Sequence, residues 1–256
     1  MMGRSAIFWG VLLSCVLLAQ AAFAQDPLSM TALRVGQDAD GATTYSLSLQ
    51  ILALMTALTV LPSIVLGMTS FTRIIIVLSI LRQALGTQQT PPNQVLIAIA
   101  LFLSLAVMAP VLDEIYTTAL SPYLADEIAA DDALRQGSDL LKDFMAANTH
   151  EDTLLMFSDM AGEGAYTKAS EIPLSVILPA FITSELKTAF QIGFLIFLPF
   201  LVIDMAIASI LMSLGMMMLS PMLISLPFKL LLFVLVDGWA MTVGSLGATF
   251  ALGTGG

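Results

Sequence analysis

Five ionisable residues in the last third of the chain are candidates for chemistry, because each lies among apolar neighbours. They are Glu185, Lys187, Asp204, Lys229 and Asp237. A charged side chain in an apolar environment is costly unless it is paired, and such residues often mark an ion pair or a proton path. The sequence therefore predicts either buried ion pairs or a proton relay in this region.

The spacing of the first two charges favours an ion pair with a more distant partner. Glu185 and Lys187 are separated by two positions, which places them on opposite sides of a helix. After Glu171 the only cations are Lys187 and Lys229. We therefore predict that Glu185 pairs with Lys229, within one chain or between subunits, and that reversing Glu185 to Lys blocks assembly.

Asp204 and Asp237 are predicted to be buried carboxylates with a structural role. Asp204 follows Pro199, and Asp237 precedes Gly238, so each is placed to cap a helix start or to accept backbone hydrogen bonds. The alternative is a proton relay, as in a proton-coupled membrane transporter. The structural role is the preferred interpretation.

A methionine cluster marks a third candidate feature. Six of the sixteen methionines fall between Met205 and Met222, and three of them, Met216, Met217 and Met218, are consecutive. Neighbours on a helix point about 100° apart, so three in a row do not share a face. Gly215 before them and Ser220-Pro221 after them favour a loop.

The residue types needed for enzyme chemistry are scarce. His150 is the only histidine, Cys15 is the only cysteine, and the sequence has no Walker A loop, nucleophile elbow or paired metal-ligand spacing. We therefore expect no catalytic residue, no metal site and no cofactor, and we do not interpret the chain as an enzyme.

The composition is that of a membrane protein. Hydrophobic residues make up 58% of the chain and charged residues 11%, with a mean hydropathy of +0.93. Residues 1–24 form a basic start, an apolar centre and a small-residue site, which predicts a signal peptide cleaved after Ala24. An uncleaved transmembrane helix is the alternative. Residues 25–46 form the N-terminal segment of the mature chain.

Residues 47–112 predict a first membrane-type helical hairpin. Leu47 to Met68 and Val95 to Leu112 are each uncharged and long enough for a span. Between them lie Arg73 and Arg82 and no acid, so the positive-inside rule places this connection in the cytoplasm.

Residues 113–171 form an acidic segment, which we expect to be a small helical part in the periplasm. It holds thirteen acids and three bases, a net charge of −10, and nucleic-acid binding is not expected. One helix is predicted after Ser138 as a potential cap, and a second from Thr149 to a stop at Gly162 and Gly164. The apolar stripe of the first comprises Leu140, Leu141, Phe144 and Met145.

Residues 172–256 predict a second helical hairpin region whose helices are broken by proline. The prolines are Pro173, Pro179, Pro199, Pro221 and Pro227. Broken helices at membrane depth are tolerated where protein covers them or where they line an aqueous path. The fold class is therefore all-α: membrane-type hairpins with proline-broken helices and an acidic periplasmic segment.

Two stretches of this second region resemble the signatures of the FliP family, subunits of the flagellar type III protein export gate. They are Pro179–Phe194 and Pro199–Met218. The likeness extends through Thr69–Leu78, Ala84–Thr87, Pro91–Val95 and Pro227–Trp239. The signal peptide, residues 25–46 and the acidic segment lack a clear family pattern.

This resemblance implies a protein-transport function. It implies a pentamer that joins FliQ and FliR in a conical helical hetero-oligomer, within the flagellar basal body of the bacterial inner membrane. FlhA and FlhB would be further export partners, and unfolded rod, hook and filament proteins the substrates. Met216, Met217 and Met218 would be the pore gate. Service in an injectisome secretion gate is the alternative.

Overall fold

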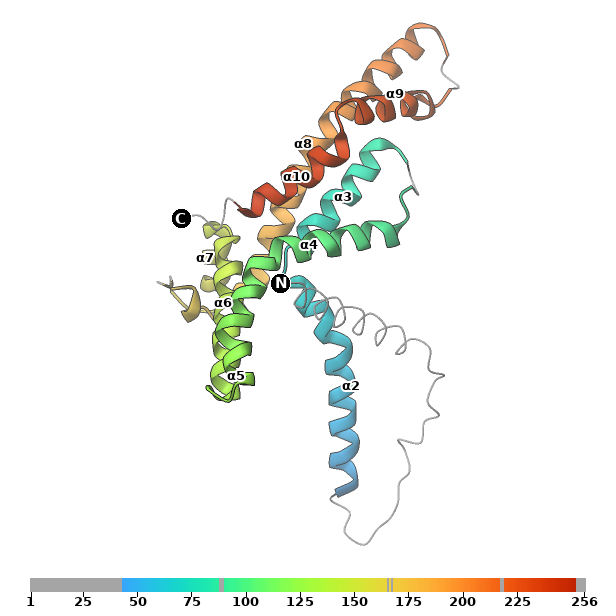
Figure 1. Ribbon diagram of the computed structural model, residues 1–256. Coiled ribbons are helices and arrows are strands. Elements are labelled where there is room, and N and C mark those ends of the chain that lie inside the picture. Colours follow the sequence, from blue (N-terminus) through green and yellow to red (C-terminus); the bar gives the residue numbers. More distant parts are fainter. Residues whose placement is uncertain (1–42, 88–89, 165, 167, 217–218, 252–256) are drawn as a thin grey trace, which may run out of the picture. The chain divides into compact units, whose positions relative to one another are not determined.

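The computed structural model describes residues 43–87, 90–164, 166, 168–216 and 219–251, and these ranges contain helices and no strand (Figure 1). The α-helices are α2 (Thr43–Gly67), α3 (Phe71–Leu85), α4 (Asn93–Ile115), α5 (Ser121–Leu124), α6 (Ala130–Ala147), α7 (Glu151–Met160), α8 (Leu174–Ser213), α9 (Pro221–Leu235) and α10 (Gly238–Ala251). A π-helix, η2 (Tyr116–Leu120), and a 3-10 turn, η3 (Ala169–Glu171), complete them. The predicted all-α class is confirmed. The predicted signal peptide and its cleavage after Ala24 lie outside the described residues.

The chain divides into two units, Met1–Thr59 and Val60–Gly256. Of the first unit the structure describes the part of α2 that ends at Thr59, where apolar side chains such as Leu52 and Leu58 are exposed. The rest of α2 and all the other helices that the structure describes belong to the second unit.

The core of the second unit forms where α3 packs along α8, with α4 on the other side of α3 (Figure 1). Buried residues of α3 recur three or four positions apart, which is the spacing of one helix face. They are Ile74, Val77, Leu78, Leu81, Ala84 and Leu85. Ile177 and Phe181 of α8 are likewise fully buried, so one apolar face of each helix makes this contact.

α8 is longer than predicted, because it continues as one helix of 40 residues through Pro179 and Pro199. The expectation that these two prolines break the helix is wrong, and it is also wrong for Pro227, which lies inside α9. Each proline removes one backbone hydrogen bond from its helix. In an apolar environment the helix tolerates this loss where neighbouring helices pack against it. The breaks lie elsewhere: between Ser213 and Pro221, and at Val236 and Asp237, where α9 gives way to α10.

The acidic segment is helical, as predicted, but its helices begin at other residues. α6 begins at Ala130 and runs through Ser138, which is therefore not a cap. α7 begins at Glu151 with His150 as its N-cap residue, while the Thr149 hydroxyl donates to the Met145 carbonyl of the preceding helix. Gly162, with φ of +74°, follows the end of α7 as predicted.

The acidic segment is not an independent solvated hairpin. Phe144 and Met145 of its predicted stripe are buried in the same core cluster as Ile74 of α3 and Phe181 of α8. Both α6 and α7 pack against α8. The polar, acidic faces of these helices remain exposed, so the segment is attached to the hairpins by its apolar stripe.

Two helical stretches are long and apolar enough to cross a membrane, Asn93–Leu124 and Leu174–Ser213. Two bent pairs would each pass as one span, Leu52–Gly67 with Phe71–Leu85 and Pro221–Leu235 with Gly238–Phe250. The predicted cytoplasmic connection after Met68 is thus mostly the apolar helix α3. Both of its arginines, Arg73 and Arg82, lie on this helix.

Candidate functional site

An ion pair between α3 and α8 is the most buried ion pair in the described part of the chain. Arg73 donates from Nε to Oε2 of Glu185 at 2.8 Å and from Nη2 to Oε1 at 2.5 Å. The two side chains are 5% and 0% exposed. A guanidinium that pairs with both carboxylate oxygens satisfies the two charges away from water. The pair therefore fixes one register between α3 and α8.

Arg73 also contacts α10, the last described helix. Its Nη1 donates to the Thr249 hydroxyl at 3.1 Å, and its guanidinium carbon lies 3.8 Å from the centre of the Phe250 ring. This is cation–π geometry. Phe250 stacks in turn on Phe144 of α6. Arg73 thus joins α3, α8 and α10 at one point.

The predicted Glu185–Lys229 pairing within one chain is wrong, because each residue has a different partner. Glu185 pairs with Arg73, and Lys229 pairs with Asp204. The prediction rests on the cations that follow Glu171 in the sequence. The packing of α3 on α8 instead places Arg73, 112 positions before Glu185, in contact with its carboxylate. The expectation that Glu185 needs a buried partner is met by that arginine.

Lys229 is the centre of a second polar cluster, at the far end of α3. Its Nζ lies 2.5 Å from Oδ2 of Asp204 and donates to the Ala84 carbonyl at 3.1 Å. The Ser225 hydroxyl donates to the other Asp204 oxygen at 2.5 Å. Lysine is favourable at a helix C-terminus because the last carbonyls carry partial negative charge. This cluster ties the end of α3 to both α8 and α9.

Asp204 and Asp237 lie in different environments. The Asp204 side chain is 34% exposed inside α8, so it neither caps a helix nor is fully buried. Asp237 is exposed and has φ of +49° at the break before α10, where its carbonyl accepts the Met241 N–H at 3.0 Å. The prediction of two buried carboxylates is therefore wrong for Asp237, which is exposed, and also for Asp204, which is only half-buried.

The run of three consecutive methionines begins in a loop, as predicted, whereas Met205 and Met212 lie in α8. α8 ends at Ser213, Gly215 adopts φ of +72°, and the Met216 N–H donates to the Leu211 carbonyl at 3.0 Å. A positive φ suits glycine, which has no Cβ to clash. Met216 is 43% exposed. Met217 and Met218 lie outside the described residues.

A third set of polar contacts attaches α7 to the outer side of α8. The His150 backbone N–H donates to the buried Ser184 hydroxyl at 3.0 Å, and its ring Nε2 lies 3.1 Å from the Thr188 hydroxyl. Lys187 donates to Asp152 at 2.8 Å. This hydrogen bond lowers the pKa of the Asp152 carboxyl below its ordinary value. Lys187 thus contacts α7, whereas Glu185, two positions earlier on α8, pairs with Arg73 of α3, as their spacing predicts.

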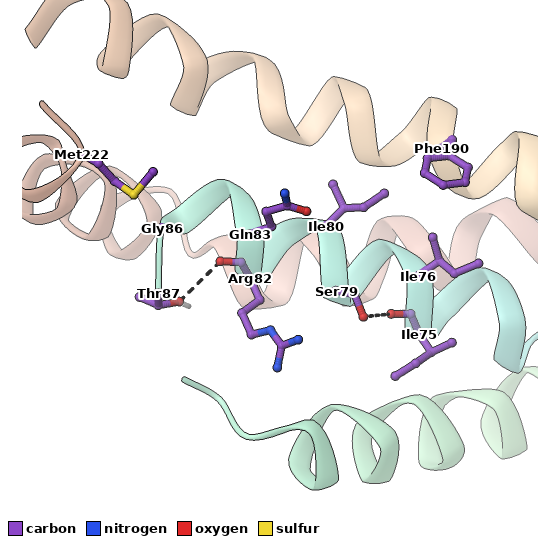
Figure 2. Close-up of a pocket in the computed structure, with 10 residues that line it drawn as sticks. All are labelled: Ile75, Ile76, Ser79, Ile80, Arg82, Gln83, Gly86, Thr87, Phe190 and Met222. Atoms are coloured by element: carbon purple, nitrogen blue, oxygen red, sulfur yellow. Dashed lines mark hydrogen bonds between the residues drawn. The ribbon is translucent and has the colours of Figure 1, made fainter. Parts of the chain in front are cut away.

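An open cleft of about 630 Å³ runs beside α3, and Figure 2 shows the side chains that line it. They are Ile75, Ile76, Ser79, Ile80, Arg82, Gln83, Gly86, Thr87, Phe190 and Met222. Most come from α3 and its C-terminal turn, while Phe190 lies on α8 and Met222 on α9. Arg82 Nη1 donates to the Pro91 carbonyl at 3.2 Å and to Asn93 Oδ1 at 2.5 Å, so it holds the turn into α4.

No group of three or more His, Cys, Asp or Glu side chains is arranged for metal binding within the described ranges. The carboxylates that face the apolar helices are engaged with cations instead: Glu185 with Arg73, and Asp204 with Lys229. This arrangement stabilises helix packing.

The sequence does not predict that two residues, Arg73 and Ser225, take part in these clusters. Arg73 lies in a run of isoleucine and valine, and it occupies the same helix face as Val77 and Leu81, four and eight positions later. A cation on the apolar face of a helix is a signal for a buried partner. Ser225 gives no comparable signal, because serine is common in apolar helices.

Comparison with known proteins gives one consistent result. The FliP family matches residues 54–246. The flagellar biosynthetic protein FliP of Cereibacter sphaeroides is 72% identical over 210 residues, which are 82% of this chain and 70% of that protein. Its namesake in Bacillus subtilis is 51% identical over 205 residues, 80% of this chain and 93% of that protein. The namesake in Caulobacter vibrioides is 46% identical over 244 residues, 95% of this chain and 90% of that protein.

Proposed function

Because the chain belongs to the FliP family, we propose that it is the core pore-forming subunit of the flagellar type III protein export gate. In this role it passes unfolded rod, hook and filament proteins across the inner membrane. Family membership and the membrane-type helices support the coarser statement, that the chain is a membrane component of the flagellar export apparatus.

The observation that carries the pore role is the turn from α8 into α9. A 40-residue apolar helix ends there in a loop that exposes Met216, and the Asp204–Lys229 pair holds the two flanking helices together. Methionine is unbranched and adapts its shape to varied neighbours. A ring of such loops, built from Met216, Met217 and Met218 of several copies, would exclude water when closed and deform around a passing polypeptide.

Exposed apolar side chains on α8 support assembly with other subunits. Phe194, Leu195 and Val202 are each more than 60% exposed, and a patch of this kind marks a protein or membrane contact. We propose that this surface serves a homo-oligomer, a pentamer by family resemblance, together with FliQ and FliR. FlhA and FlhB are the proposed partners for substrate delivery.

We propose that the acidic segment, residues 113–171, faces the periplasm, with residues 47–112 and 172–256 forming the two hairpin regions. Its net charge of −10 and its exposed acidic faces support an aqueous location. The names of the curated relatives favour flagellar duty over an injectisome.

A deletion strain complemented with plasmid-borne variants tests the pore role. Wild-type protein should restore motility and secretion of hook protein, and replacing Met216, Met217 and Met218 together with Ala should keep assembly but let small ions leak through the membrane. Met205→Ala and Met212→Ala, on the exposed side of α8, are matched controls. Normal membrane tightness in the triple variant would contradict a methionine gate, and unrestored secretion by wild type would contradict flagellar duty.

A further inference from the structure

The cleft beside α3 has a polar end and an apolar end. Arg82, Gln83 and Thr87 line it at the C-terminal end of the helix, while Ile75 and Ile76 line it towards the N-terminal end. The seven positions between Ile75 and Arg82 correspond to about 10 Å along the helix axis. The cleft is therefore amphipathic along its length.

Arg82 keeps donors available at the polar end. Both of its hydrogen bonds to described residues, to Pro91 and Asn93, come from Nη1. Within the described part of the chain no carboxylate lies within ion-pair distance of Arg82, whereas Arg73, Lys187 and Lys229 each have one. Nε and Nη2 form the side of a guanidinium that binds a phosphate or carboxylate through two parallel bonds.

The apolar end offers a continuous hydrocarbon wall. Ile75, Ile76 and Ile80 are half-buried along α3, and Phe190 of α8 is 61% exposed. Figure 2 shows Phe190 on the neighbouring helix, close to the end of α3 where Ile76 lies. An exposed aromatic ring beside three isoleucines is stabilised by contact with an apolar ligand.

We propose that this cleft binds an anionic phospholipid, with the phosphate held by Arg82 and an acyl chain lying on Ile75, Ile76, Ile80 and Phe190. Arg82, the cation that lines the cleft, has no carboxylate partner among the described residues, so its charge matches the phosphate. The direction from the polar to the apolar end matches a lipid molecule. Basic pockets between membrane helices are known to bind such headgroups. This inference goes beyond the export function proposed above and does not depend on it.

A protein segment is the competing occupant, and the cleft fits it less well. A strand would need partners for its own backbone polar groups along the contact, yet the middle and apolar end of the cleft offer one hydroxyl, Ser79, which already donates to the Ile75 carbonyl at 2.7 Å. An apolar helix satisfies its own backbone groups, but it would give the free donors of Arg82 no acceptor. A lipid needs polar contacts at one end only.

Lipid binding is measured by native mass spectrometry of the full chain purified in detergent, with any partners that remain bound. Phosphatidylglycerol and phosphatidylcholine with identical acyl chains are titrated separately. We expect phosphatidylglycerol to bind roughly fivefold more tightly, as one basic residue at a lipid site provides. Arg82→Gln should bring the affinity ratio close to one.

Two further variants separate this result from misfolding. Gln83→Glu adds a negative charge at the polar end but keeps the Arg82 bonds to Pro91 and Asn93, so it should also lower the ratio. Arg135→Gln removes an exposed cation of α6 and should leave it unchanged. The proposal would be overturned by equal affinities for the two lipids, or by an affinity ratio that neither cleft variant changes. Displacement of the lipid by millimolar inorganic phosphate alone would also overturn it. Reduced recovery of partner subunits with unchanged lipid binding would also overturn it, in favour of a protein occupant.

Discussion

Arg73 and Glu185, 112 positions apart in sequence, meet in a bidentate ion pair that is closed off from solvent between α3 and α8. Thr249 and Phe250 extend this contact to α10. A buried pair of this kind contributes little relative to a well-packed apolar core, but removing one partner strands the other charge. Its main effect is to allow one alignment of the three helices.

Replacing Glu185 should therefore be severe. Glu185→Gln leaves the Arg73 guanidinium buried without a counter-charge, and we expect a loss of about 3–5 kcal/mol in the free energy of unfolding. Glu185→Lys should be worse and should block assembly of the complex. Thermal unfolding in detergent and the yield of co-purified complex measure the two effects.

The partly exposed Lys187–Asp152 pair provides the matched control for that experiment. Its side chains are 43% and 68% exposed, and solvent screens exposed pairs so that they contribute little to stability. Lys187→Gln should therefore change the unfolding temperature only slightly. Equal effects of Glu185→Gln and Lys187→Gln would mean that the buried pair does not organise the helices.

Asp204 and Asp237 should respond differently to the same substitution. Asp204→Asn weakens the only described carboxylate contact of Lys229, which is 3% exposed, and we expect a loss of about 1–3 kcal/mol. Asp237→Asn should be nearly neutral, because Asp237 is exposed and asparagine tolerates its positive φ. Thermal unfolding of the two variants makes the comparison.

Export assays on the same two variants separate a structural role from a proton relay. With a structural role, any loss of export in Asp204→Asn accompanies a loss of assembled complex. A variant that assembles fully yet loses export driven by the proton motive force would contradict this interpretation and favour a relay.

The features that the sequence predicts correctly follow from local rules. The helical class, the loop at Met216 and the stop after α7 follow from apolar periodicity and from glycine at Gly215 and Gly162. The separation of Glu185 and Lys187 onto different faces follows from helix geometry alone. Such features need no knowledge of the rest of the fold.

The errors concern properties that packing decides. The list of cations after Glu171 predicts a Glu185–Lys229 pair, but the alignment of α3 on α8 sets the partners. Pro179 and Pro199 predict helix breaks, but a helix supported by neighbours continues through them. The apolar neighbours of Asp237 predict a buried side chain, yet it lies exposed at a break.

Acidification should weaken the attachment of α7 to α8 through Asp152. The hydrogen bond from Lys187 lowers the pKa of the Asp152 carboxyl in the folded state below its ordinary value of 3.8. The contribution to stability is therefore present above pH 3.8 and is lost as the pH falls through the lowered folded-state pKa. Wild type should unfold at a higher temperature than Asp152→Asn at pH 7, and the difference should disappear in strong acid.

The control for this pH dependence is Lys187→Gln, which removes the cause of the shift. In that background, Asp152→Asn should have little effect at any pH. A difference between wild type and Asp152→Asn that grows as the pH falls below 3.8 would have the wrong sign for a lowered pKa and would contradict the assignment.

The contact of Gly193 with Ile80 should make the α3–α8 crossing sensitive to a single methyl group. A Cβ at Gly193 would lie 2.4 Å from Cδ1 and 3.2 Å from Cβ of Ile80. We expect Gly193→Ala to cost about 1–3 kcal/mol through overpacking, more than the gain from helix propensity. Gly244→Ala in α10 is the control, because a Cβ there meets no described atom within 4 Å, and it should stabilise by about 0.5–1 kcal/mol. Adding Ile80→Ala should relieve the Gly193→Ala clash. Equal unfolding temperatures of Gly193→Ala and Gly244→Ala would show that α3 and α8 do not approach this closely.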